Sequence, residues 1–378
     1  MNLRLLHLAD LHLGANCAFL GEKAGERKKD FERAFERAMD FARDAANGID
    51  LVVIAGDLFD SHRPEPRLVE LVRRKFAAVR EAGVSIVLAP GTHDTSSYRD
   101  CVYREENLGD ILLLSDDSDC PVSFEVGDKT VHIYGAVRGI HCRDVPLDKM
   151  SRISADGVHI GVMHAAVQPT SGVDFSGGEL GVTLPDLAKT RLDYIALGHY
   201  HNFKQYPADG VTAVYPGTLE GRSFRETGDR YLVTVTFTPG GPAVEKTRFN
   251  ARTIRQETID LDRTPCCDQS ELCNRVESVA DKDAIVEFIV RGDAEFSFST
   301  AAIEEMFADK FFYLRIVDET RVYCARWVKQ FRDERTVRGI FVRILIERID
   351  NASTDEEKRL LDMALRLGLT ELAGDDAD

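Results

Sequence analysis

The chain has 378 residues, of which 44% are hydrophobic and 30% are charged, and this length and composition suit a globular protein of two or three domains. Its formal net charge of −16 excludes indiscriminate binding of nucleic acid by the whole surface, while it permits a local basic face. No apolar run is long enough to cross a bilayer or to act as a signal peptide, and the eight cysteines lack metal-binding spacing, so we expect a cytoplasmic protein without membrane contact.

The N-terminal part of the chain predicts alternating strands and helices. Continuous apolar runs at residues 3–9, 51–55 and 85–89 are typical of strands that are covered on both faces. Between them, apolar residues recur with helical spacing over about 31–42 and 68–79. This strand–helix–strand–helix–strand order predicts a parallel sheet whose strands all end at one edge.

Further apolar runs predict a second sheet. We expect it to pack face to face with the first sheet, with helices outside, so that residues 1–250 form an α/β two-sheet sandwich. The strands assigned to the second sheet are residues 131–134, 160–163, 194–197, 213–215 and 231–237.

The pattern changes after residue 250. Two strand-like runs, each preceded by a helix-like segment, predict a small α+β domain over residues 266–320. Residues 333–373 predict a pair of C-terminal helices with apolar stripes. These stripes either pack wholly on each other or leave a groove for the helices of a partner. They consist of Val337, Phe341, Ile344 and Leu345 on the first helix, and of Leu360, Leu361, Ala364 and Leu365 on the second.

Short polar segments follow five of the strand-like runs. They are built around Asp, His and Gly, and the loops that carry them should converge at one edge of the sheets. Carboxylate oxygens and imidazole nitrogens bind divalent metal ions, and a site for two ions needs several of them from separate loops. The segments are Asp10-Leu11-His12, Gly56-Asp57-Leu58-Phe59-Asp60, Gly91-Thr92-His93-Asp94, Met163-His164 and Gly198-His199-Tyr200-His201.

The spacing within these segments suits metal ligands, although each segment alone gives weak support. Residues i and i+2 of an extended chain face the same side, so Asp10 can act with His12, and His199 with His201. The carboxylate of Asp57, which follows a glycine at a strand end, can bridge two ions. A single segment of this kind more often holds a structural histidine, but the ordered set predicts a metal-dependent hydrolase of phosphate esters.

The histidine of the third segment suggests acid–base chemistry. If His93 does not bind metal, it could protonate the leaving oxygen or stabilise charge on the phosphoryl group. Its ring would then need a carboxylate to orient it, and Asp60 and Asp94 are the two candidates.

Together the segments resemble those of the calcineurin-type metallophosphoesterases. The strings Ala9-Asp10-Leu11-His12-Leu13-Gly14 and Gly56-Asp57-Leu58-Phe59-Asp60 are similar to those of the SbcD-type branch, the nuclease subunits of DNA double-strand-break repair complexes. The resemblance is specific over about residues 1–230 and looser over residues 266–378.

This resemblance implies two divalent metal ions, typically manganese, and the hydrolysis of DNA as a double-strand exonuclease and single-strand endonuclease. It also implies that His93 is a catalytic histidine that binds no metal, with Asp60 as a candidate to orient it. The implied ligands of one ion are Asp10, His12, Asp57 and His201, and those of the other are Asp57, His164, His199 and the residue at position 92, Thr92.

Position 92 departs from the family pattern, which has Asn where this chain has Thr92. A neutral hydroxyl on a short β-branched side chain reaches less far than an amide carbonyl, so the second ion should be held more weakly or be completed by water. Two other functions therefore stay open. One is a phosphodiesterase or phosphatase of the same fold that acts on a small nucleotide or a phosphoprotein, and the other is a catalytically weakened scaffold subunit.

Three residues near the segments are predicted to bind substrate: His62, Arg63 and Arg222. Their charged groups suit phosphate, although a solvated loop or salt bridges would explain them more simply in so acidic a protein. The resemblance implies DNA as the substrate and an SbcC-type coiled-coil ATPase as the partner of the C-terminal helices. It also implies a homodimer of this chain within a heterotetramer.

Overall fold

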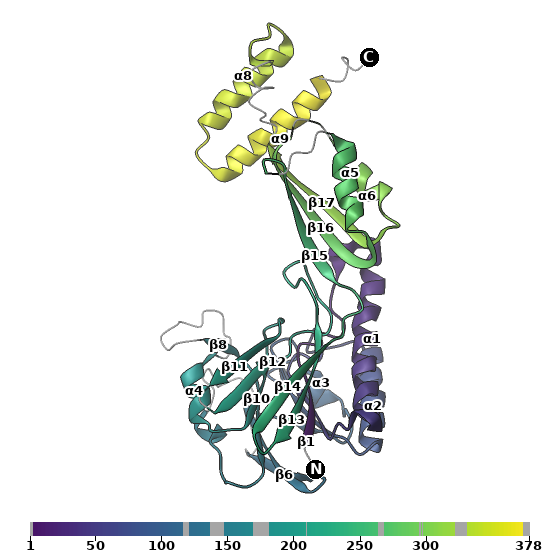
Figure 1. The fold of residues 1–378 in the computed structure, drawn as a ribbon, viewed down its shortest axis with the longest axis vertical. Helices are drawn as coiled ribbons and strands as arrows, with labels where there is room; N and C mark the ends of the chain where they lie inside the picture. The colour runs from purple at the N-terminus through teal and green to yellow at the C-terminus, as the bar shows by residue number, and fades with distance from the viewer. Residues whose placement is uncertain are drawn as a thin grey trace. The chain divides into compact units, whose positions relative to one another are not determined.

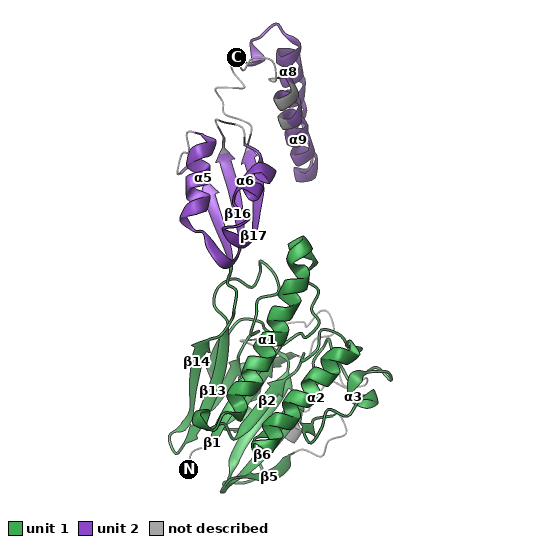
Figure 2. Cartoon of the chain, turned by 90° about the vertical axis from the view of Figure 1, so that its right-hand side faces the viewer, with its two compact units in different colours: residues 1–254 green, residues 255–378 purple. Residues whose placement is uncertain are grey.

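The computed structural model describes residues 3–115, 121–136, 147–168, 181–208, 210–263, 268–294, 296, 298–321 and 331–372. The chain forms two compact units, residues 1–254 and 255–378, which Figure 2 shows in green and purple. All five polar segments belong to the first unit.

The first sheet has six strands in the order β14-β13-β1-β2-β3-β4. Strands β1 to β4 pair in parallel, whereas β13 is antiparallel to both β1 and β14. Strand β2 is buried along its whole length, in agreement with its continuous apolar sequence. The strands are β1 (Leu3–Leu8), β2 (Leu51–Ala55), β3 (Ser85–Ala89), β4 (Leu112–Leu113), β13 (Tyr231–Thr238) and β14 (Gly241–Arg248).

The second sheet also has six strands, in the order β11-β12-β10-β7-β6-β5. Its four central strands are parallel, and β5 and β11 close its two edges with antiparallel pairing. The strands are β5 (Val122–Val126), β6 (Lys129–Ala136), β7 (Val158–His164), β10 (Tyr194–Gly198), β11 (Lys204–Ala208) and β12 (Val211–Tyr215).

The prediction that residues 231–237 belong to the second sheet is wrong. These residues lie in β13, which pairs with β1 in the first sheet from Leu3–Phe237 to His7–Val233. An apolar run indicates a buried strand but does not indicate which sheet contains it. Here the chain leaves β12 and crosses to the open edge of β1, and the crossing segment carries Arg222.

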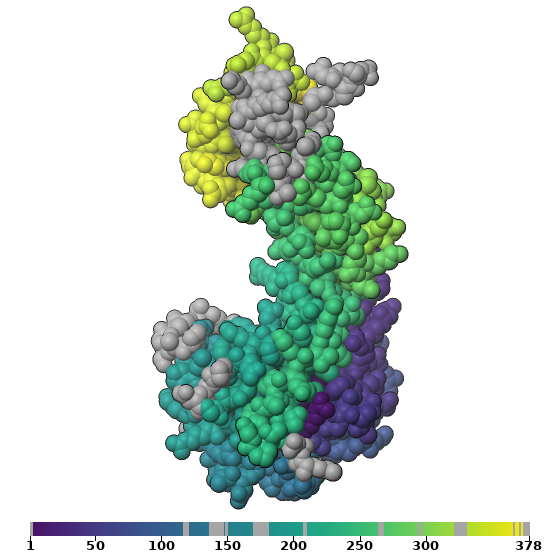
Figure 3. All heavy atoms as spheres, viewed as in Figure 1, coloured from purple at the N-terminus to yellow at the C-terminus, as the bar shows by residue number. Residues whose placement is uncertain are grey.

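Helices cover the outer face of each sheet, so the first unit has the layers helix, sheet, sheet and helix (Figure 1). Helices α1 (Ala24–Arg43) and α2 (Pro66–Glu81) lie side by side on the first sheet, and α4 (Leu184–Lys189) packs on the second. A further apolar core fills the space between the two sheets. In the space-filling view, green residues of β13 and β14 lie beside the dark purple start of β1, as their pairing requires (Figure 3).

Short elements connect these layers. The second sheet is flanked by the two-stranded sheet β8-β9, whose strands are parallel. The short elements are η1 (Ala18–Lys23), η2 (Ala45–Asn47), α3 (Val102–Glu105), η3 (Leu147–Met150), β8 (Ala166–Gln168) and β9 (Gly181–Thr183).

The second unit contains a three-stranded sheet in the order β15-β16-β17, with β16 and β17 parallel. Apolar residues of two helices complete its core. Its elements are β15 (Ile254–Asp260), α5 (Gln269–Ser278), β16 (Asp281–Asp293), α6 (Thr300–Met306) and β17 (Phe311–Arg321).

Two C-terminal helices, α8 (Val337–Asp350) and α9 (Asp355–Leu372), pack on each other. Part of the predicted apolar stripes forms their shared core, including Leu345 and Leu365. Another part stays outside it, since Val337 is 73% exposed. Among the residues described, no helix combines the length and the apolar character that crossing a bilayer requires.

Candidate metal centre

The polar segments meet where strands of both sheets end. Between the loops after β1 and β2, the backbone N–H of Asp10 donates to the carbonyl oxygen of Gly56 at 3.0 Å, and that of His12 to the carbonyl oxygen of Asp57 at 2.9 Å. From the second sheet, His164 is the last residue of β7. The ends of parallel strands therefore bring these side chains to one place, as the order of the segments predicted.

Two glycines allow the segments to approach one another this closely. A β-carbon at Gly198 would overlap the carbonyl oxygen of Ala55 at the end of β2. A β-carbon at Gly91 would overlap the carboxylate of Asp57. A side chain at Gly198 would force the two sheets apart, and one at Gly91 would push apart the loops that follow β2 and β3 in the first sheet.

Four of the five non-glycine residues with a positive φ among the described residues lie in the polar segments. The values are 53° for Asp10, 46° for His12, 51° for Asp57 and 107° for His199. A left-handed backbone costs an L-residue on the order of 1 kcal/mol or more. Because the surrounding structure must enforce such strain, it is typical of functional sites.

The structure brings five predicted ligands into two overlapping groups. Ligand atoms of Asp10, His12 and His201 lie within 4.8 Å of one another, and so do those of Asp10, Asp57 and His164. Oδ2 of Asp57 lies between the groups, 3.7 Å from Nε2 of His12 and 3.4 Å from Nε2 of His164. Adjacent ligand groups that share carboxylates are what a pair of divalent ions requires.

The other two predicted ligands, His199 and Thr92, border these groups. The backbone N–H of His199 donates to Oδ1 of Asp10 at 3.0 Å, and its ring lies edge-on to that of His164 with centroids 5.4 Å apart. The hydroxyl of Thr92 donates to Oδ2 of Asp57 at 3.4 Å. A ligand role for His199 or Thr92 stays a prediction.

The buried charges of the centre fit a divalent ion. Within the described part of the chain, Nε2 of His164 is buried without a hydrogen-bond partner. Burial opposes the charged form of His164, but the charges of Asp57 and Asp10 outweigh it and raise the pKa to about 9. Burial likewise opposes the ionised form of Asp57, yet the neighbouring His164 and His12 hold its pKa well below the usual range. These carboxylates therefore favour positive charge at the place where Nε2 of His164 faces Oδ2 of Asp57.

His12 is held in the tautomer that metal binding needs. Its Nδ1 is 3.0 Å from Oδ1 of Asp60, and its Nε2 is 2.8 Å from Nη1 of Arg222. A guanidinium can only donate, so Nε2 carries the lone pair and Nδ1 donates its proton to Asp60. Burial lowers the pKa of His12 and so favours this neutral form, whose Nε2 can bind a metal ion.

Glu226 is a residue of the centre that the sequence did not predict. Nδ1 of His201 donates to Oε1 of Glu226 at 2.6 Å, and this leaves Nε2 of His201 facing the ligand group. A carboxylate behind a metal-binding histidine fixes its tautomer and ring orientation. Glu226 lies in the long loop between β12 and β13, where no spacing pattern marks it.

The two carboxylates proposed to orient His93 have different surroundings. Nδ1 of His93 is 3.2 Å from the backbone carbonyl oxygen of Asp60 and 3.5 Å from its Oδ1. Asp94 instead faces inward and accepts hydrogen bonds from the backbone N–H groups of Gly91 and Phe59 and from the hydroxyl of Tyr103. Asp60 therefore contacts the ring of His93, and Asp94 fixes the loops beneath it.

The predicted substrate-binding residues lie at different depths. His62 stacks on Tyr98 with centroids 4.2 Å apart, and Arg63 pairs with Asp100 at 3.2 Å, so both contact residues outside the ligand groups. Arg222 lies inside the cluster, where its Nη2 is 3.1 Å from Oδ1 of Asp60. The structure therefore joins only Arg222 of these three directly to the predicted ligands.

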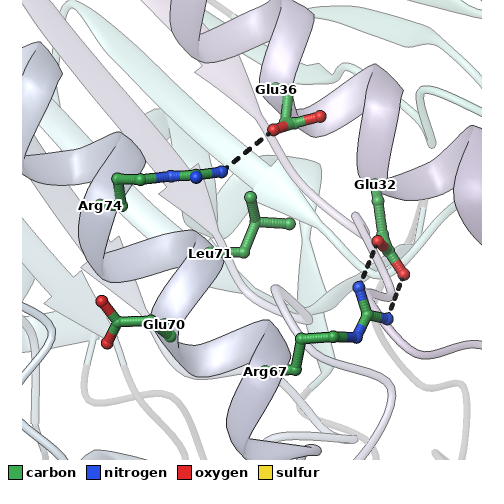
Figure 4. A pocket seen from close by; sticks show the side chains of 6 residues that line it. All are labelled: Glu32, Glu36, Arg67, Glu70, Leu71 and Arg74. Carbon is green, nitrogen blue, oxygen red and sulfur yellow. Dashed lines mark hydrogen bonds and ion pairs between the residues drawn. The ribbon is translucent and has the colours of Figure 1, made fainter.

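A separate surface pocket of about 450 Å³ lies between α1 and α2 (Figure 4). Its arginines are already paired, because Arg67 makes two contacts of 2.7 Å with Glu32, and Arg74 lies 3.4 Å from Glu36. The glutamates neutralise the cations that an anionic ligand would need. This pocket is therefore less suited than the metal centre to binding phosphate.

Comparison with known families gives one match that covers more than half of the chain. Residues 3–203 match the family described as calcineurin-like phosphoesterase. That range includes all the predicted ligands and excludes Arg222 and Glu226.

Individual relatives are similar over most of the chain. It is 28% identical to the uncharacterized metallophosphoesterase YhaO of Bacillus subtilis, over 74% of this chain and 68% of that protein. It is 25% identical to the DNA double-strand break repair protein Mre11 of Archaeoglobus fulgidus, over 78% of this chain and 66% of that protein. The Haloferax volcanii protein of the same name is 28% identical, over 80% of this chain and 64% of its own length. The chain thus spans about two thirds of the length of these relatives.

Proposed function

Since the chain belongs to the calcineurin-like phosphoesterase family, we propose that it is a two-metal phosphodiesterase that cleaves DNA in double-strand-break repair. The observation that carries the proposal is the pair of ligand groups that share Asp10 and meet at Asp57. DNA as the substrate is supported by relatives that are named as DNA double-strand break repair proteins.

The proposed cofactor is a pair of divalent ions, with manganese as the metal that the resemblance to the SbcD-type nucleases implies. When bound, the ions would supply Lewis-acid activation of the phosphodiester and of the attacking water. The residues proposed to hold one ion are Asp10, His12, Asp57 and His201, and those proposed for the other are Asp57, His164, His199 and Thr92.

His93 is proposed to move a proton during the reaction. Its ring lies edge-on to that of His12, with centroids 4.8 Å apart, and its side chain is 41% exposed. A carbonyl oxygen only accepts, so Nδ1 of His93 keeps its proton toward Asp60 and leaves Nε2 for exchange with the leaving oxygen. Asp60 acts as a positioning residue for both His12 and His93.

The proposed partner is an SbcC-type coiled-coil ATPase that binds helices α8 and α9. Apolar side chains remain exposed on both helices after they pack together, among them Ile344 and Leu360. Exposed apolar residues along paired helices suit the helices of a partner. The proposed assembly is a heterotetramer that contains two copies of this chain.

The direct test is a nuclease assay of the purified full chain with linear duplex DNA and added manganese. Asp57→Asn should lose both hydrolysis and metal, because a neutral amide does not compensate two adjacent dications. His93→Ala should keep its metal while hydrolysis slows about a hundredfold or more. Metal content and hydrolysis of the two variants together distinguish a metal-ligand role for Asp57 from a proton-transfer role for His93.

Each alternative function has its own result in this assay. Hydrolysis of a small phosphodiester such as bis(p-nitrophenyl) phosphate without cleavage of DNA would favour the alternative of a small nucleotide or a phosphoprotein as the substrate. Metal binding without hydrolysis of either substrate would favour the scaffold function. Full activity of Asp57→Asn would overturn the two-metal proposal itself.

A further inference from the structure

Arg222 reaches into the metal centre from the loop between β12 and β13. Its Nη1 is 2.8 Å from Nε2 of His12, and its Nη2 is 3.1 Å from Oδ1 of Asp60. The side chain is 23% exposed, so the guanidinium borders both the ligand atoms and the solvent. One cation therefore contacts a predicted metal ligand and the carboxylate that orients it.

The backbone of this loop is held independently of the Arg222 side chain. Oε2 of Glu226 accepts the backbone N–H of Arg222 at 2.8 Å, while its other oxygen accepts from His201. The carbonyl oxygen of Gly221 accepts from the fully buried Arg27 of α1 at 2.7 Å. The loop should keep its path when the guanidinium moves or is removed.

A divalent ion and Arg222 need the same atom. The lone pair on Nε2 of His12 cannot accept a hydrogen bond from Nη1 and bind an ion at the same time. An ion at that nitrogen displaces Nη1 and also repels the guanidinium. The contact between Nη2 and Asp60 uses other atoms, so it can persist and keep the displaced group beside the ion.

We propose that Arg222 is a phosphate-binding arm that metal binding releases from His12. Once released, Nη1 donates to a non-bridging oxygen of a phosphodiester while Nη2 remains on Asp60. The planar fork of arginine suits this geometry, since it presents parallel N–H donors to an anion. The inference rests on the proposed function, because it requires a divalent ion at His12.

Calorimetric titration of the full chain tests the competition and the phosphate contact separately. Manganese is titrated first, and inorganic phosphate is then titrated into the manganese-loaded protein. Arg222→Ala should bind manganese about tenfold more tightly, because the competing hydrogen bond is gone, and phosphate about tenfold more weakly. Arg222→Lys keeps the charge but not the fork, so it should recover only part of the phosphate affinity.

Arg225→Ala is the matched control, because Arg225 lies in the same loop with an exposed side chain. It should bind both manganese and phosphate as the wild type does. If Arg222 only supported the structure of the site, Arg222→Ala would bind manganese more weakly than the wild type. The inference about Arg222 is overturned if Arg222→Ala binds manganese no more tightly than the wild type, or binds phosphate equally well. Either result leaves the proposed function standing. A wild type that binds no manganese overturns the proposed function as well.

Discussion

At the scale of single residues, position 92 tests the proposed site for the second ion. The hydroxyl of Thr92 lies 3.4 Å from Oδ2 of Asp57, so the side chain points toward the centre without a close contact. An asparagine there would offer a carbonyl oxygen on a longer side chain. Thr92→Asn should lower the manganese concentration needed for half-maximal hydrolysis and raise the rate, because it adds a ligand at small packing cost.

Thr92→Val is the matched control, since it removes the hydroxyl and keeps the shape of the side chain. It should hydrolyse no faster than the wild type at any manganese concentration. If the wild type is active and Thr92→Asn behaves like Thr92→Val, water or another residue already completes the site.

A buried histidine outside the centre predicts how stability depends on pH. His7 is fully buried, its Nδ1 is 2.8 Å from the hydroxyl of Tyr194, and burial lowers its pKa to about 3 from the usual 6.5. Between these values the unfolded chain binds a proton that the folded chain does not, so stability falls as the pH drops from about 6.5 to about 3. The double variant His7→Leu, Tyr194→Phe should lose less stability between pH 7 and pH 4.5 than the wild type does.

Urea denaturation at the two pH values checks this prediction. Replacing both partners removes the imidazole and the hydroxyl together, so the double variant should stay within about 1 kcal/mol of the wild type at pH 7. Tyr194→Phe alone removes the partner of His7 and should cost about 1–3 kcal/mol. An equal loss of stability in acid for the double variant and the wild type would contradict the assignment to His7.

The sequence predicted which candidate ligands meet in the centre, but it did not predict which carboxylates contact the histidines. Asp10 and Asp57 follow buried strands and His164 is the last residue of one, and parallel strands bring their ends to one edge whatever the loops do. Glu226 could not be predicted, because its contact with His201 depends on the path of a loop. For the same reason the sequence could not decide whether Asp60 or Asp94 contacts His93.

At the scale of elements, the centre depends on how closely β10 approaches β2. Gly198 lies against the carbonyl oxygen of Ala55, and a β-carbon there would also lie 2.8 Å from Nδ1 of His164. Gly198→Ala should therefore destabilise the fold by about 1–3 kcal/mol through overpacking and should weaken metal binding. Denaturation and manganese titration measure the two effects.

Gly240→Ala is the control, since a β-carbon at Gly240 meets nothing closer than Oγ1 of Thr238 at 3.7 Å. It should match the wild type in metal affinity. If Gly198→Ala also matched it, close contact between the two sheets would not be needed for the centre.

The sequence predicted some elements of the fold and misplaced others, depending on whether a strand pairs with a near or a distant part of the chain. The three parallel strands β1, β2 and β3 and their helices were predicted because local periodicity and short connections determine that order. Strand β13 was assigned to the wrong sheet because its partner, β1, lies more than 200 residues away in the sequence. Burial of a strand can be inferred from its own residues, whereas its neighbour depends on the rest of the chain.

At the scale of the whole molecule, the metal centre and the C-terminal helices belong to different units. The residues of the centre all lie between Asp10 and Glu226, and α8 begins at Val337. A chain truncated before Glu334 should keep metal-dependent hydrolysis of a small phosphodiester and lose binding of the proposed ATPase partner. Copurification of the two proteins, together with the hydrolysis assay, measures both properties.

A point variant gives the same test with the helices retained. Ile344 is 48% exposed, so Ile344→Glu should leave the core of α8 and α9 intact while it places a charge on the apolar surface. Val342→Glu is the contrasting change, since Val342 is 1% exposed and its replacement should unfold the helix pair. ATPase binding by Ile344→Glu at the wild-type level would remove this surface from the proposed interface.

The left-handed backbone of the ligand residues also limits how this chain can diverge. Asp10, His12 and Asp57 adopt a positive φ that glycine adopts without strain, so glycine at these positions would remove backbone strain while it deletes a proposed metal ligand. At these positions, therefore, substitutions that remove backbone strain also remove side chains of the metal centre. A descendant freed from selection for hydrolysis should accumulate glycines at these positions first, and such glycines would mark a lineage in which catalysis has been abandoned and the fold retained.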